Sequence, residues 1–391
     1  MEHYIFYCKL SLLAVLSLIT ACCMLSRRWY VNLAAFLACL SGETFLAHLF
    51  FPGYMLCPAA ASFIILFLSR IWDLSRTPAK GNGADPIRLP VRSGIRESRL
   101  EFHYHYSNFL VYGGAGSGKT KSIGKWLLSE YMRLGFAGFI YDFKDTDYTR
   151  TAYNLIKRHR YPHKFYYVSF DRPERSYRFN PLKVVRDRTE LIQLMEDVLL
   201  ALLPKKEQQN EWVAGGLGIL RGVAFRFWDE FPEHCTLPHI LAFIMTASAR
   251  QLSLFLQQNL VSEMLAGAYL KAEGSEKTQA SYLSTLCNNL ATISQNEEIA
   301  YVLSGDDFDF NLIDPETPKL FAVSNNFSKN SVYAPVISML MTISARQFSM
   351  QNRVPFVYFL DEMTTVNIKN FETLPSVLRE YKAAFILLTQ S

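Results

Sequence analysis

One short stretch of the sequence spaces glycines, a lysine and a threonine so that they can hold phosphate groups. Residues 111–122 read VYGGAGSGKTKS and contain the pattern G-x-x-x-x-G-K-[ST]. In such a loop, backbone N–H groups wrap the phosphates at the positive end of a helix, Lys119 reaches the β and γ phosphates, and Thr120 offers its hydroxyl to Mg²⁺. The pattern predicts ATP and Mg²⁺ as ligands, although the same loop serves kinases, GTPases, transporters and motors. The predicted contacts are Gly113, Gly114, Ala115, Gly116, Ser117, Gly118, Lys119, Thr120 and Lys121.

A second stretch ends in two adjacent acids. Residues 354–362 read VPFVYFLDE, an apolar run closed by Asp361 and Glu362. Asp361 is expected to orient Mg²⁺ through its water ligands, and Glu362 is placed to polarise the attacking water as a general base. The alternative is a buried strand with a capping acid. In a chain that already carries a phosphate-binding loop, the pair favours catalysis.

Other polar side chains follow predicted strands. Residues 385–389 are predicted to form a core strand, and Gln390 comes directly after them, where it can sense the γ-phosphate or simply be a polar strand end. Asp142 and Lys144 close another apolar run. Polar residues at such strand ends tend to lie near the ligand crevice of an α/β sheet. For Asp142 and Lys144, this interpretation and ordinary loop solvation have equal weight.

The elements that must position these residues alternate between strand and helix from residue 102, which is typical of an α/β core. The run FHYHYSNFLVY alternates up to the phosphate-binding loop, and KSIGKWLLSEYMRLG follows with apolar residues at helical spacing. A long helix is expected over 331–348. Further strands are predicted at 135–145, 164–171, 319–325, 354–362 and 385–389.

The strands are interrupted by a helical region. Residues 185–304 carry amphipathic patterns, including a single helix expected over 277–303. We therefore predict an all-α insertion at 185–304 between two parts of the core, 102–184 and 305–391. The basic side chains of the insertion are either a DNA-binding face or ordinary solvated surface.

The amino-terminal region is predicted to anchor the chain in a membrane. Leu10–Leu25 is uncharged, and two more apolar stretches follow at 31–51 and 54–71. A signal peptide is the competing interpretation, but Arg27 and Arg28 stand where a small-residue cleavage site would be expected.

The topology of this anchor, residues 1–75, has two alternatives. Basic residues after the first and last stretches favour three spans with the amino terminus outside. Glu43 and His48 make the middle stretch a poor span, which leaves two spans with the amino terminus inside. Both place the body of the chain in the cytoplasm. Residues 76–101 are predicted to be a basic linker that meets anionic headgroups or DNA.

Composition and cysteines narrow the classes of protein further. The chain has 391 residues, a formal net charge of +5 and seven cysteines. The charge permits contact with nucleic acid or anionic lipid. The cysteines show neither C-x-x-C pairs nor metal-ligand spacing, so we expect reduced thiols and not a disulfide framework or a zinc site.

Taken in order, these motifs resemble a known family. A membrane anchor, GGAGSGKT, YDFKD one strand later, FNPL before the helical insertion, FLDE and LREYKAAFILLTQ are similar to the TraG/TraD-type coupling proteins of type IV secretion and conjugation. These belong to the FtsK–HerA group of RecA-like DNA motors. The resemblance covers residues 90–391 and implies a RecA-like P-loop NTPase core.

The resemblance also implies an activity and partners. Such proteins are hexameric ATPases of the bacterial inner membrane, which bring a relaxase–DNA complex to the secretion channel and drive single-stranded DNA or protein through it. By position, Asp361 and Glu362 are the Walker B pair and Gln390 matches a third motif. Arg379 matches an arginine that reaches the nucleotide of the neighbouring subunit, although it is also placed as an ordinary helix-end arginine.

The sequence departs from the family pattern at two places. Asp145 follows Lys144 where the family has glycine, and the chain stops at Ser391, where a complete core continues with further strands. We expect a fragment, a core completed differently, or an inactive product. The remaining alternatives are an ATPase for protein cargo only and a docking protein without turnover. A solute-transporter domain lacks support because VLSGDDF at 302–308 is not the signature L-S-G-G-Q.

Overall fold

A computed structural model describes residues 85–93, 96–114, 116–143, 146–204, 206–368 and 370–390. All of them belong to one compact unit, Ala84–Ser391. The predicted membrane spans between residues 10 and 71 lie outside the described residues. Within the described ranges, no helix has both the length and the apolar character needed to cross a bilayer.

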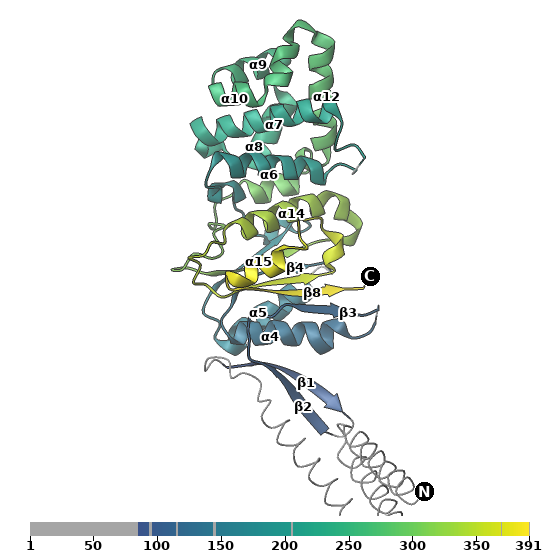
Figure 1. Cartoon of the computed structure of the whole chain (residues 1–391), viewed down its shortest axis with the longest axis vertical. Coiled ribbons are helices and arrows are strands. Elements are labelled where there is room, and N and C mark those ends of the chain that lie inside the picture. Colours follow the sequence, from purple (N-terminus) through teal and green to yellow (C-terminus); the bar gives the residue numbers. More distant parts are fainter. Residues whose placement is uncertain are drawn as a thin grey trace, which may run out of the picture. The chain divides into compact units, whose positions relative to one another are not determined.

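The centre of the unit is a parallel sheet of six strands in the order β3-β8-β7-β4-β6-β5 (Figure 1). Strands β4, β6 and β7 are buried along their whole length, as expected of parallel strands covered on both faces. The predicted α/β class is therefore confirmed, and the sheet is consistent with a RecA-like core. The strands are β3 Phe109–Tyr112, β4 Ala137–Asp142, β5 Lys164–Ser169, β6 Lys319–Ser324, β7 Phe356–Asp361 and β8 Ala383–Thr389.

The register of the strands brings the predicted site residues to one edge. Tyr112 pairs with Thr389, and Asp361 pairs with Leu388. Asp142 pairs with Ser324. The segments that follow β3, β7, β8 and β4 therefore all leave the carboxyl edge of the sheet.

Helices cover the two faces of the sheet (Figure 1). Helices α4 (Lys125–Arg133) and α5 (Asp147–His159) share one buried cluster with the β7 side chains of Val357 and Phe359. Helix α14 (Asn330–Arg346) shares the other cluster with the alternate β7 residues. This alternation follows from the two-residue period of a strand. A short helix, α15 (Leu374–Glu380), precedes β8.

Part of the predicted linker forms an antiparallel hairpin instead. Strands β1 (Ile87–Ser93) and β2 (Arg96–Phe102) pair along their length. Fully buried Ile87 anchors the hairpin, while the Arg88 N–H donates to a Glu130 carboxylate oxygen at 2.9 Å. The strand expected over 102–112 is thus divided, because a turn at Tyr104–Ser107 separates β2 from β3.

All regular elements among the described residues of the insertion are helices, and the insertion lies on the side of α14 away from the sheet (Figure 1). The single helix predicted over 277–303 is broken, because the Asn296 side chain accepts a hydrogen bond from the N–H of Ile299 and starts a new helix. The α-helices are α6 Arg188–Ala201, α7 Glu211–Glu230, α8 Leu237–Thr246, α9 Ala249–Gln257, α10 Leu260–Leu265, α11 Gly267–Lys271, α12 Glu276–Ser294 and α13 Glu297–Leu303.

Short helical turns complete the described chain. A π-helical segment, η2 (Lys119–Gly124), precedes α4 without a break. The 3-10 turns are η3 Pro173–Arg175, η4 Pro181–Val184, η5 Pro232–His234, η6 Ala272–Gly274, η7 Phe327–Lys329 and η8 Met363–Thr365.

Candidate nucleotide-binding site

The predicted phosphate-binding loop connects β3 to a helix, as the motif requires. Gly116 and Gly118 have φ values of 75° and 83°, a region that glycine enters without steric penalty. The π-helical segment that begins at Lys119 has no side-chain cap and no acid in its first turn. The segment itself therefore carries no carboxylate at its positive end, which suits an anion such as a phosphate. Ala115 lies outside the described residues.

The Lys119 ammonium lies across this loop. It donates to the carbonyl of Gly113 and, at 3.0 Å, to the carbonyl of Thr389 at the end of β8. The N–H of Gly113 also donates to Thr389 at 3.3 Å. Neutral carbonyls are weaker partners for an ammonium than phosphate oxygens. The lysine is thus placed where phosphate can replace its present acceptors.

Glu362 and Gln390 are brought together from neighbouring strand ends. The N–H of Gln390 donates to one carboxylate oxygen of Glu362 at 3.2 Å, and its side-chain amide donates to the other. Glu362 has a φ of 49°, which is sparsely populated by residues with a side chain. Its own carbonyl accepts the Thr365 hydroxyl at 2.7 Å. This conformation turns the carboxylate toward Gln390.

A buried polar group behind Glu362 was not predicted from the sequence. The Tyr141 and Thr365 hydroxyls lie 2.6 Å apart, and the Asn325 amide donates to Tyr141 at 2.9 Å. Together they support the backbone turn at Glu362. They belong to no short motif, and only the apolar pattern around Tyr141 indicated that it would be buried.

Asp361 and Asp142 end neighbouring strands and are 3% and 0% exposed. Asp142 accepts the N–H of Thr149 at 2.8 Å and its hydroxyl at 3.0 Å. Burial raises the pKa of Asp142 to about 6, against the lowering effect of these bonds. Burial of Asp142 rules out ordinary loop solvation, and these contacts give it a structural role at the start of α5. Lys144 and Asp145 lie outside the described residues.

Arg379 is not part of this group of residues. It is exposed near the end of α15, before β8 begins. Gln390 lies beyond the other end of β8, and that strand has seven residues. At about 3.3 Å per residue, the two are separated by roughly 20 Å along the strand. Within one chain, therefore, the structure does not bring Arg379 to Glu362.

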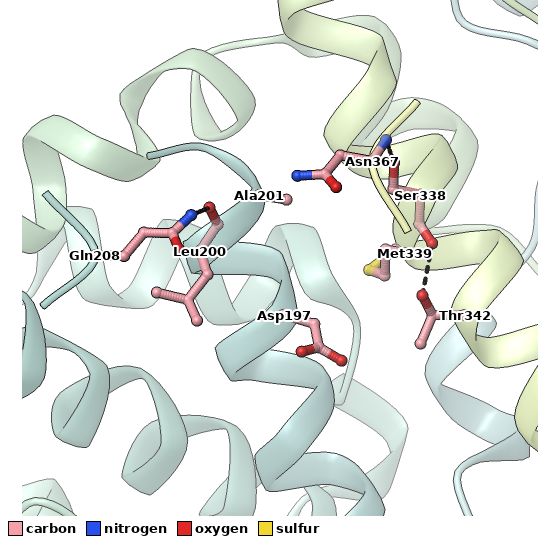
Figure 2. A pocket seen from close by; sticks show the side chains of 8 residues that line it. All are labelled: Asp197, Leu200, Ala201, Gln208, Ser338, Met339, Thr342 and Asn367. Atoms are coloured by element: carbon pink, nitrogen blue, oxygen red, sulfur yellow. Dashed lines mark hydrogen bonds between the residues drawn. The ribbon is translucent and has the colours of Figure 1, made fainter. Parts of the chain in front are cut away.

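The structure also contains a cavity of about 160 Å³ between α6, α14 and the segment after β7 (Figure 2). A neighbouring cavity of about 270 Å³ shares Asp197 and Thr342 with it. Neither includes a residue of the phosphate-binding loop. The residues lining the first are Asp197, Leu200, Ala201, Gln208, Ser338, Met339, Thr342 and Asn367.

Among the described residues, no group of three or more His, Cys, Asp or Glu side chains is arranged to hold a metal ion. A cation in a phosphate-binding loop does not need such a group, because its ligands are a hydroxyl, phosphate oxygens and water. The half-buried Thr120, at the start of the helix, offers the hydroxyl. The residues present therefore fit a Mg²⁺–nucleotide complex.

The parallel α/β sheet, the glycine loop between β3 and a helix, and the acid pair at the end of β7 define the class of P-loop nucleotide-binding proteins. Residues 87–391 match the family model T4SS-DNA_transf, "Type IV secretory system Conjugative DNA transfer". The chain belongs to this family, and the resemblance noted from its motifs is confirmed.

Solved structures of a bacterial conjugative coupling protein share this fold. The chain matches an unbound form of the bacterial conjugative coupling protein TrwBdeltaN70 with a TM-score of 0.59 and 15% identity, over 83% of this chain and 68% of that one. It matches TrwB in complex with the ATP analogue ADPNP with a TM-score of 0.58 and 16% identity, over 83% and 70%. For TrwB with ADP and Mg²⁺, the TM-score is 0.55 and the identity 16%, over 73% and 63%.

At these identities the likeness shows the fold alone. In the last comparison the chain covers less than two thirds of the TrwB structure. No curated protein sequence matches the chain.

Proposed function

We propose that this protein is a membrane-anchored ATPase that couples a relaxase–single-stranded DNA complex to a type IV secretion channel and drives transfer by ATP hydrolysis. The observation that carries the proposal is the Glu362 carboxylate, held by Gln390 at the same sheet edge as Lys119. Membership of the conjugative DNA transfer family supports the DNA substrate. The complexes of TrwB with nucleotides support the ligand class.

The loop residues hold the nucleotide in this proposal. Backbone N–H groups from Gly114 to Lys119 surround the phosphates, with Lys121 at the rim. Lys119 leaves the carbonyls of Gly113 and Thr389 to contact the β and γ phosphates. Thr120 and, through water, Asp361 would hold Mg²⁺, which would offset phosphate charge.

Glu362 is the proposed general base. Its carboxylate accepts two N–H groups of Gln390, and such bonds favour the ionised form that can take a proton from water. Gln390 follows β8, beside the strand that carries Asp361. It is therefore placed to report a change at the γ-phosphate directly to the base.

Arg379 acts between subunits in this proposal. Its exposure and its distance from Glu362 in the same chain favour a contact with the next protomer. A closed ring, which we expect to be a homo-hexamer, supplies such a residue to each site from a neighbour. A guanidinium there stabilises charge that develops on the transferred phosphoryl group.

The location of the protein is part of the proposal. The apolar stretches of residues 1–75 would anchor it in the bacterial inner membrane as a multi-pass protein, with the catalytic body in the cytoplasm. There the body can meet ATP, the relaxase–DNA complex and the components of the channel.

ATP hydrolysis by the full-length protein in detergent, with and without single-stranded DNA, tests the function. We expect stimulation by single strands that falls steeply with salt, because phosphate contacts release counterions. Lys119→Ala is expected to abolish turnover. Unchanged turnover in this variant would refute the assigned site. Hydrolysis without any DNA response would favour protein cargo, and nucleotide binding without turnover would favour a docking protein.

A further inference from the structure

The side chain of Tyr148, in the first turn of α5, extends to the phosphate-binding helix. Its ring packs against Phe359 of β7 with the centroids 4.6 Å apart, and the residue is 1% exposed. Its hydroxyl is buried beside the Thr120 side chain, outside ideal hydrogen-bond geometry. Burial raises the pKa of Tyr148, and contact with Thr120 opposes that rise. The phenol is therefore a neutral group at the side chain proposed to bind the cation.

Gly124 makes this approach possible. It lies four residues after Thr120, so the two face the same side of the helix. A Cβ atom at residue 124 would lie 2.4 Å from the Tyr148 hydroxyl oxygen and 3.1 Å from two of its ring carbons. Any side chain at this position would displace the phenol from Thr120. The glycine and the tyrosine thus form a matched pair across two helices.

We propose that Tyr148 is a positioning residue that fixes the orientation of the Thr120 hydroxyl for Mg²⁺. This inference rests on the proposed role of Thr120 as a cation ligand. A threonine hydroxyl has one proton and two lone pairs, and its proton rotates to suit its neighbours. A fixed hydroxyl beside it selects one rotamer and one proton direction, which leaves a lone pair free for the cation. Alternatively, Tyr148 serves the fold alone, through its ring.

Tyr148→Phe separates these roles because it keeps the ring on Phe359 and removes only the hydroxyl. The readout is binding of the fluorescent analogue mant-ATP at increasing Mg²⁺ concentration. We expect the Mg²⁺ concentration for half-maximal binding to rise about five- to tenfold, the size of one hydrogen bond that the phenol would form with Thr120 once Mg²⁺ is bound. Binding of mant-ADP in excess EDTA should be unchanged. A Mg²⁺ requirement equal to that of the wild type would overturn the inference.

Tyr131→Phe is the matched control. Tyr131 is also fully buried in the same apolar cluster, but its hydroxyl donates to the carbonyl of His105 at 2.9 Å. Its loss should lower stability and leave the Mg²⁺ requirement unchanged. If both variants shift the requirement equally, the effect is structural and Tyr148 has no positioning role.

Two further variants distinguish the inference from the function on which it rests. If Thr120→Ala leaves the Mg²⁺ requirement unchanged, the proposed cation ligand is wrong. If Thr120→Ala raises it and Tyr148→Phe does not, only the positioning role fails. Gly124→Ala should raise the Mg²⁺ requirement by displacing the phenol. Adding Tyr148→Phe to Gly124→Ala should restore part of the lost stability, because the hydroxyl makes the closest contact, and should not restore the Mg²⁺ requirement. Equal stability of Gly124→Ala with and without Tyr148→Phe would contradict the contact.

Discussion

At the level of single residues, the buried acids at the carboxyl edge of the sheet differ in what their oxygens contact. Glu362 accepts two N–H groups from Gln390, a residue of another strand end. Asp142 accepts both of its bonds from Thr149, only seven residues away. The first arrangement links two elements at the site, whereas the second starts a helix. Equal burial therefore does not imply equal function.

The raised pKa of Asp142 predicts a pH-dependent stability. Burial raises this pKa from 3.8 to about 6, so between these pH values the folded chain holds a proton that the unfolded chain has released. Stability therefore falls as the pH rises through this window, by up to about 3 kcal/mol. Asp142→Asn removes this titration. Between pH 4 and pH 7 the free energy of unfolding of this variant should rise relative to that of the wild type by about 2–2.5 kcal/mol.

Urea denaturation without nucleotide, at several pH values, measures this difference. A constant offset between the two proteins is expected as well, because an amide replaces a carboxyl in a buried place. The prediction concerns only how the difference in free energy of unfolding between the two proteins changes with pH. Parallel stability curves from pH 4 to pH 7 would show that Asp142 keeps an ordinary pKa in the folded chain.

At the level of elements, close helix packing in the insertion depends on glycines of α7. A Cβ at Gly218 would lie 2.8 Å from the carbonyl oxygen of Leu265, a backbone atom that cannot move alone. Gly218→Ala should therefore separate α7 from α10 and lower the free energy of unfolding by about 1–3 kcal/mol. Chemical denaturation followed by circular dichroism checks this value.

Gly267→Ala, in α11 of the same insertion, is the control. Nothing lies within 4 Å of a Cβ at residue 267, so the change should be neutral within about 0.5 kcal/mol. If Gly218→Ala is as stable as Gly267→Ala, the close approach of α7 and α10 is wrong.

The sequence predicted elements whose pattern is local and missed features that depend on distant contacts. Strands β4, β6 and β7 were predictable because continuous apolar runs have few other stable environments. The β1–β2 hairpin was missed because its recurring arginines suggested a basic linker. Its stability comes from contacts with α4, such as the Trp126 indole that donates to the carbonyl of Arg88 at 2.6 Å.

The site shows the same division. The loop and the acid pair follow from fixed spacings, but the αL conformation of Glu362 and the approach of Tyr148 to Thr120 do not. Both arise where separate elements meet at the sheet edge. A pattern of residue types along one segment does not reveal which distant elements it will contact.

At the level of the whole molecule, the proposed site lies between two protomers. Arg379→Ala should then bind nucleotide normally and lose most hydrolysis, because the finger acts on the transition state. Lys119→Ala should lose hydrolysis for a different reason, in the loop of its own chain. Each variant retains the part that the other lacks. The ATPase activity of rings that contain both variants therefore tests whether one site is built from two chains.

In a randomly mixed ring of the two variants, a site is complete when an Arg379→Ala protomer supplies the loop and its Lys119→Ala neighbour supplies the arginine. At equal amounts, about a quarter of the sites meet both conditions. We expect about a quarter of wild-type ATPase activity from a mixture of two nearly inactive proteins, after dissociation and reassembly.

Reassembly of each variant alone is the control, and light scattering verifies that mixed rings form. Because a finger acting in its own chain leaves every site of the mixture defective, an inactive mixture of assembled rings would refute the role of Arg379 between subunits.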